Sequence, residues 1–246
     1  MCETCRLKNL AQRPLPSRRA VLGLVAASTI GLALGSAAGA KDAKPPPKPQ
    51  NVLSPDAALE RLHQGNQRYI DGVSKRHDFK HEREALAGGQ NPYAGILSCA
   101  DSRIAPEYAF DSGRGDLFVC RVAGNFANTE SIASLEYGVA ILKTPLILVL
   151  GHESCGAVDA TIKSLKDGTT LPGHLPSLVA AIEPAVKAVS GQPGNLLDNA
   201  TRQNVIDNVA KLKSATPILS AAVEQKKLKV VGGIYRLRDG RVDMIV

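Results

Sequence analysis

The chain has 246 residues, of which 44% are hydrophobic and 22% charged, a composition typical of one globular domain with a sizeable core. Aromatic residues make up only 4% and there is no Trp, which argues against a nucleic-acid surface built on base stacking. The net charge is +7, but residues 1–40 hold five basic residues and one acidic residue, and without them the charge is +3. The charge therefore makes no case for binding nucleic acid or a membrane surface.

Residues 1–40 carry the pattern of a twin-arginine export signal. Arg18-Arg19 precedes an apolar run over about residues 21–37, and Ala38-Gly39-Ala40 is a small-x-small cleavage signal. We therefore expect export, cleavage before Lys41, and a periplasmic mature protein without a membrane anchor. An uncleaved anchor is the alternative, but the run is short and weakly apolar for a membrane span.

A Lys/Pro-rich stretch over residues 41–53 predicts an extended linker, followed by a folded domain over residues 54–246. Ser54-Pro55-Asp56 predicts the start of a helix, because Ser is a good N-cap and Pro suits the first turn. Apolar residues then recur at helical spacing, and a second, short helix is expected near residues 81–86. The first helix has the apolar set Ala57, Ala58, Leu59, Leu62 and Tyr69.

From Tyr93 onward, strand-like apolar runs alternate with amphipathic helical segments. Strands are predicted over residues 94–98, 116–121, 146–150 and 228–237, with 241–245 pairing after an Asp-Gly turn. Helices are predicted over residues 131–142, 155–165, 178–189, 205–212 and 217–225. This alternation predicts an α/β fold with a mostly parallel central β-sheet flanked by helices, preceded by an N-terminal helical arm. Ligands in such folds bind at the carboxyl ends of the strands.

Two motifs follow predicted strands: Cys99-Ala100-Asp101-Ser102-Arg103 and His152-Glu153-Ser154-Cys155-Gly156. Two thiolates and one imidazole suit zinc, and three protein ligands leave one position for chemistry. The alternative is a pair of buried core cysteines and a capping histidine. The position of both motifs after strands, with an acid and a base beside Cys99, favours the metal site.

The cysteines of the chain do not suggest a disulfide framework. Cys99, Cys120 and Cys155 leave an odd number after the predicted cleavage. Cys2-x-x-Cys5 lies in the predicted signal without further Cys or His partners, so we expect no metal or redox role for it.

The two motifs resemble the signature motifs of the β-class carbonic anhydrases, in order and at a similar separation. Residues 115–125 and 136–139 are similar to that family as well, and the resemblance runs from about Ser54 to the C-terminus. It implies zinc on Cys99, His152 and Cys155, and reversible hydration of CO₂ to bicarbonate and a proton. Because two thiolates neutralise the charge of Zn²⁺, we expect a less acidified water and activity favoured at alkaline pH.

Asp101 has two possible roles. It could be the fourth zinc ligand in a closed form, or it could pair with Arg103 and accept a hydrogen bond from the attacking hydroxide. The alternative is that Asp101 and Arg103 form an ion pair at the surface without a catalytic role. Another branch of the family has a Trp three residues before the first Cys, in an inhibitory bicarbonate site that Arg121 and Tyr235 would also approach. Ile96 stands at that position here, so we expect the open form.

The resemblance also places residues in a CO₂ pocket, some of them across a subunit boundary, and implies a homodimer or a dimer-based tetramer. Three functional alternatives stay open: hydrolysis of carbon disulfide or carbonyl sulfide at the same site, a non-catalytic zinc-binding module, and a structural protein with reduced cysteines. A core or helix-face role is the alternative for each individual pocket residue. The predicted pocket residues are Gln90, Phe118, Tyr137 and Gly156, and the candidates for proton transfer are His63, His77, His81 and His174.

Overall fold

The structure, a computed structural model, describes residues 52–246. The predicted signal over residues 1–40, its Cys2-x-x-Cys5 pair and all but the last two residues of the predicted linker lie outside this range. Among the described residues, no helix combines the length and the apolar character that a bilayer crossing requires.

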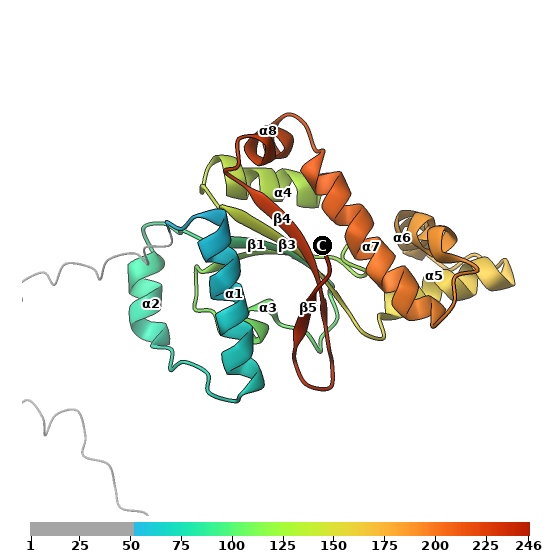
Figure 1. The fold of residues 1–246 in the computed structure, drawn as a ribbon, viewed down its shortest axis with the longest axis horizontal. Coiled ribbons are helices and arrows are strands. Elements are labelled where there is room, and N and C mark those ends of the chain that lie inside the picture. Colours follow the sequence, from blue (N-terminus) through green and yellow to red (C-terminus); the bar gives the residue numbers. More distant parts are fainter. Residues whose placement is uncertain (1–51) are drawn as a thin grey trace, which may run out of the picture. The chain divides into compact units, whose positions relative to one another are not determined.

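A five-stranded sheet forms the centre of the fold, in the order β2-β1-β3-β4-β5 (Figure 1). Its first four strands pair in parallel, and β5 pairs antiparallel with β4. Every residue of β1 and β3 is buried, as expected of parallel strands covered on both faces. The expected α/β class is therefore confirmed. The strands are β1 (Ala94–Ser98), β2 (Leu117–Arg121), β3 (Leu146–His152), β4 (Lys229–Tyr235) and β5 (Val242–Met244).

Helices cover both faces of this sheet. On one face, α1 and α3 contribute Leu62 and Ala109 to the apolar cluster that contains Leu148 of β3. On the other face, α4, α7 and α8 pack against the alternate residues of the same strands, such as Val149. The helices are α1 (Pro55–Ile70), α2 (Phe79–Leu86), α3 (Pro106–Ala109), α4 (Thr129–Ala140), α5 (Gly156–Asp167), α6 (Leu175–Val189), α7 (Leu196–Lys213) and α8 (Ile218–Glu224).

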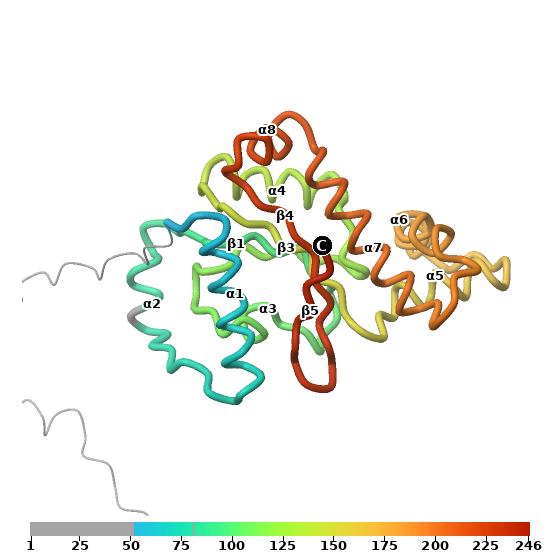
Figure 2. The backbone as a smooth tube through the Cα atoms, viewed as in Figure 1, coloured from blue at the N-terminus to red at the C-terminus, as the bar shows by residue number. Residues whose placement is uncertain are grey.

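A third apolar cluster lies beyond the carboxyl ends of β1 and β3. The chain leaves β3 into α5, continues through α6 and returns along α7 toward β4 (Figure 2). Val158, Ile182 and Val186 of α5 and α6 pack with the sulfur-bearing residues Cys99 and Cys155. The predicted zinc ligands therefore have an apolar wall on one side.

Three details differ from the predicted elements. Helix α7 begins at Leu196, well before residue 205, because Asn195 caps it by accepting a hydrogen bond from Asp198 N at 3.1 Å. Its buried Asn204 and Asn208 interrupt the apolar spacing on which the prediction depended. The single-turn helix α3 has no predicted counterpart. Ser54 caps α1 as predicted, but Ala57 in the predicted apolar set is exposed.

Candidate metal centre

The pairing of β1 with β3 brings the two sequence motifs together. Ser98, the last residue of β1, is in register with Leu150, and β3 ends two residues later at His152. Cys99 directly follows β1, and Cys155 precedes the first residue of α5. The ligand atoms of Cys99, His152 and Cys155 lie within 4.8 Å of one another, and all three residues are buried.

The His152 imidazole is prepared to bind a metal through Nε2. Its Nδ1 lies 2.8 Å from the Glu153 carbonyl oxygen, which can only accept, so Nδ1 carries the proton and Nε2 keeps its lone pair. Nε2 has no hydrogen-bond partner, although the residue is 0% exposed. An unpartnered buried acceptor costs free energy, and a metal ion would satisfy it. This donor set therefore fits a zinc ion.

The pKa values of the two thiols are shifted in opposite directions. Hydrogen bonding from Cys155, with help from the Gly124 N–H at 3.3 Å, lowers the pKa of Cys99 below its usual range. The same neighbour, Cys99, raises the pKa of Cys155. Cys155 is the N-cap of α5, where the helix dipole favours negative charge. A divalent cation would displace the remaining proton and bring both sulfurs to the thiolate state.

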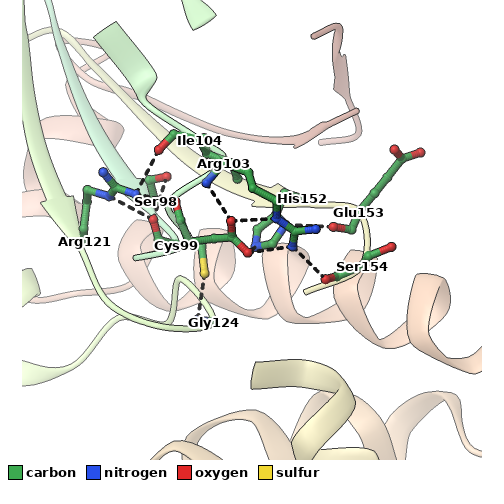
Figure 3. A network of polar contacts seen from close by, with 10 residues as sticks. Ser98, Cys99, Arg103, Ile104, Arg121, Gly124, His152, Glu153 and Ser154 are labelled. Atoms are coloured by element: carbon green, nitrogen blue, oxygen red, sulfur yellow. Dashed lines mark hydrogen bonds and ion pairs between the residues drawn. The ribbon is translucent and has the colours of Figure 1, made fainter. Parts of the chain in front are cut away.

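Arg103 fixes the Asp101 carboxylate with a bidentate pair. Its Nε and Nη2 donate to Oδ1 and Oδ2 at 2.9 and 2.7 Å, and its backbone N donates to Oδ1 at 2.9 Å (Figure 3). Arg103 holds the pKa of Asp101 well below its usual range. Asp101 Oδ2 lies 3.8 Å from His152 Nε2, so the ionised carboxylate faces the ligand cluster.

Arg121 holds the loop that carries these residues. Its Nε donates to the Cys99 carbonyl at 3.0 Å, and its Nη2 donates to the Asp101 and Ile104 carbonyls at 2.7 and 2.9 Å (Figure 3). The sequence indicated Arg121 within the family-like segment 115–125 and near a regulatory site of another branch, but not as a residue that holds this loop. This role could not be predicted from the sequence, because all three groups that Arg121 binds are backbone carbonyls, which every residue has.

The predicted pocket residues divide into two groups. Gly156 begins α5 beside Cys155, with open space where a Cβ would lie. Phe118 and Tyr137 pack together, with ring centroids 6.3 Å apart, but Phe118 is in register with Gly95, four residues before Cys99. At a strand rise of about 3.3 Å per residue, that places Phe118 roughly 13 Å from the level of Cys99.

Gln90 is exposed and precedes β1. Cys99 follows the other end of the same strand. Within one chain, Gln90, Phe118 and Tyr137 thus lie away from the ligand cluster.

Comparison with known proteins points to a single family. The family model described as carbonic anhydrase matches residues 94–242. Carbonic anhydrase 2 of Mycobacterium tuberculosis is 38% identical over 189 residues, which cover 76% of this chain and 91% of that protein. The carbonic anhydrase of Mycolicibacterium smegmatis is 37% identical over 194 residues, covering 78% of this chain and 93% of the relative. The structure of the β-carbonic anhydrase CcaA aligns with a TM-score of 0.58 at 28% identity, covering 76% of this chain and 98% of that one.

Proposed function

The chain belongs to the β-class carbonic anhydrase family, and we propose that it catalyses the reversible hydration of CO₂ to bicarbonate and a proton with zinc on Cys99, His152 and Cys155. One observation carries the assignment of this site: two buried sulfurs lie within 4.8 Å of a buried imidazole nitrogen that has no other partner. Zinc, when bound, lowers the pKa of a coordinated water and so supplies a nucleophile near neutral pH.

The other residues of the site act on that water and on access to it. Asp101 is ionised and can only accept, so a water molecule between it and the cluster would donate a hydrogen bond to the carboxylate and keep a lone pair for CO₂. Arg103 holds this carboxylate in the accepting position by its bidentate pair. The apolar wall of Val158, Ile182 and Val186 excludes bulk water from one side.

Stopped-flow CO₂ hydration on the full chain, purified with its thiols protected, tests this proposal. We expect acceleration over buffer that is lost in Cys155→Ser, together with loss of bound zinc measured by atomic emission. No acceleration by the unsubstituted protein would refute the assigned activity. Parallel assays with carbonyl sulfide and carbon disulfide identify a hydrolase with the same site.

We further propose that residues 1–40 export the protein to the periplasm. The Arg18-Arg19 pair, the apolar run and Ala38-Gly39-Ala40 support this assignment. In bacterial fractions we expect a mature form that begins at Lys41, with the precursor retained inside when both arginines are changed to lysine. A wild-type precursor that stays in the cytoplasm at full length would contradict it.

We also propose that a second copy of the chain completes the CO₂ pocket, in a homodimer or a dimer-based tetramer. Gln90, Phe118 and Tyr137 lie away from the ligand cluster of their own chain, and a partner's copies could reach it. A large apolar side chain is exposed beside Tyr137: Ile141, four residues later at the end of α4, is 62% exposed. Exposed apolar surface of this kind is typical of interfaces.

A further inference from the structure

Glu153 lies between His152 and Cys155 in the sequence, yet its carboxylate points away from Cys99 and binds the connection between β4 and β5. It follows His152 directly, and in Figure 3 its carboxylate extends to the side opposite Cys99. The Glu153 carboxylate does not belong to the ligand cluster, so Glu153 is not expected to bind the metal itself.

The connection between β4 and β5 binds this carboxylate. Arg236 Nη1 donates to Glu153 Oε1 at 3.0 Å, and the Leu237 backbone N donates to Oε2 at 3.0 Å. Arg236 is itself fixed, because its Nε donates to Asp243 Oδ2 of β5 at 2.6 Å. Both carboxylate oxygens of Glu153 are therefore held by a segment far away in the sequence.

The backbone of Glu153 carries this constraint to His152. The Glu153 carbonyl oxygen accepts the hydrogen bond from His152 Nδ1 at 2.8 Å, which fixes the protonated nitrogen and the plane of the ring. The next residue, Ser154, has a φ of 51°, a left-handed conformation that a non-glycine residue keeps only where its surroundings enforce it. Its carbonyl accepts from Arg103 Nη2 at 3.2 Å.

We propose that Glu153 is a positioning residue: its carboxylate, anchored by Arg236 and Leu237 N, holds the peptide carbonyl that orients His152 for zinc. This inference rests on the proposed zinc site. Without the carboxylate, two bonds would still hold these peptides: Glu153 N to the Tyr235 carbonyl at 3.1 Å, and Arg103 Nη2 to the Ser154 carbonyl at 3.2 Å. Neither bond involves the Glu153 carbonyl, so this acceptor of the imidazole would be held less firmly. Partners that orient metal-binding histidines typically contribute about 10–100-fold in affinity, and we expect about tenfold here because Glu153 acts through its own backbone.

Zinc affinity of the full chain, measured by competition with a chromophoric chelator, tests the proposal. We expect Glu153→Ala to raise the zinc dissociation constant about tenfold, and Glu153→Gln, which retains one acceptor oxygen, to raise it less. Asp239→Asn is the matched control, because that exposed carboxylate accepts from Arg241 N in the same connection and not from the ligand loop. We expect it to bind zinc like the unsubstituted protein.

A second readout separates positioning from general stability. In zinc-loaded protein labelled with ¹⁵N-histidine, we expect the His152 Nδ1 proton to exchange with solvent faster in Glu153→Ala than in Asp239→Asn. Unchanged affinity and exchange in Glu153→Ala, or an equal loss in Asp239→Asn, would overturn the role of Glu153. If Glu153→Ala does not fold, Glu153→Gln and Arg236→Lys carry the same comparison. Failure of the unsubstituted protein to bind zinc or hydrate CO₂ instead refutes the proposed function.

Discussion

Arg103 and Asp101 form the ion pair on which the proposed chemistry of the site depends. The carboxylate lies close enough to the ligand cluster to face it, at 3.8 Å from His152 Nε2, yet both of its oxygens are occupied by Arg103. A planar guanidinium holds both oxygens in a fixed bidentate geometry, which the ammonium group of a lysine does not provide. The geometry therefore favours a carboxylate that accepts from water over one that becomes a ligand.

We predict that Arg103→Ala lowers kcat/KM for CO₂ hydration by about 100-fold, because an unanchored Asp101 is displaced by an ångström or more. Arg103→Lys should recover only part of the activity, since it keeps the charge without the bidentate geometry. Stopped-flow measurements at matched zinc content check both variants. Activity of Arg103→Ala equal to that of the unsubstituted protein would show that Asp101 needs no anchor.

The motifs alone were sufficient to predict which side chains the structure brings together. Cys99, His152 and Cys155 meet because each belongs to a motif that ends a strand or begins a helix. Arg121 and Glu153 could not be assigned in this way. Arg121 binds backbone carbonyls, and Glu153 depends on a contact with Arg236 that only the folded chain creates.

Glycines in the sheet set the distance between β3 and α7. A Cβ at Gly151 would lie 2.6 Å from Val205 Cγ2 and 3.0 Å from Ile234 Cδ1. A Cβ at Gly138 of α4 would meet nothing closer than Phe118 Cδ1 at 3.5 Å, an ordinary contact. Gly151 is therefore required by the close packing of β3 against α7, whereas the position of Gly138 has room for a larger residue.

We predict that Gly151→Ala lowers the free energy of unfolding by about 1–3 kcal/mol, because it overpacks the interface of β3 with α7. Gly138→Ala should instead raise it by about 0.5–1 kcal/mol, since Ala restricts the unfolded chain and suits a helix. Urea denaturation followed by circular dichroism measures both. Equal effects of the two substitutions would contradict a steric cause.

Asp111 ties α1 to the segment that leads into α2. Its side chain is 1% exposed and accepts from Arg68 Nε at 2.5 Å and from the Lys75 backbone N at 2.9 Å. Burial opposes ionisation, but these hydrogen bonds and the Arg68 charge outweigh it and lower the pKa of Asp111. A lowered pKa stabilises the fold above the ordinary Asp value of about 3.9, and this stabilisation is lost as the pH falls through the folded-state pKa.

We therefore predict that Asp111→Asn lowers the free energy of unfolding at pH 7 by about 2 kcal/mol, the usual contribution of hydrogen bonds to a charged group. The variant should also lose less stability than the unsubstituted protein on acidification below about pH 4. Denaturation curves at several pH values measure this slope. Asp71→Asn, at an exposed carboxylate near the end of α1, is the control, and a similar change there would point to general charge effects.

At the level of the whole molecule, one edge of the sheet bears two residues of the proposed shared pocket, Phe118 and Tyr137. β2 is an edge strand, and its Phe118 packs against Tyr137 of α4, which remains half exposed. Ile141 follows on the same helix end. The fold of one chain brings the proposed metal ligands together but leaves Phe118 and Tyr137 away from them.

We predict that Ile141→Glu shifts the protein to a smaller assembly and lowers kcat/KM, with zinc content unchanged, because a charge on this apolar surface disfavours association. Leu175→Glu, at an exposed apolar residue at the start of α6, is the matched control and should leave the assembly intact. Light scattering after size-exclusion chromatography gives the mass. A variant of reduced mass with full activity would exclude a pocket shared between subunits.

The parallel pairing of β1 with β3 also constrains the order of events in the biogenesis of the protein. Cys99 follows β1 and His152 ends β3, and α3, β2 and α4 separate the two residues along the chain. If a metal ion bound both residues in the unfolded chain, its binding free energy would have to offset the entropy lost in closing the loop between them. Once the sheet has formed, that loop is already closed. We therefore expect metal loading to follow sheet formation, so that the compartment in which the chain folds determines which metal ions it meets first.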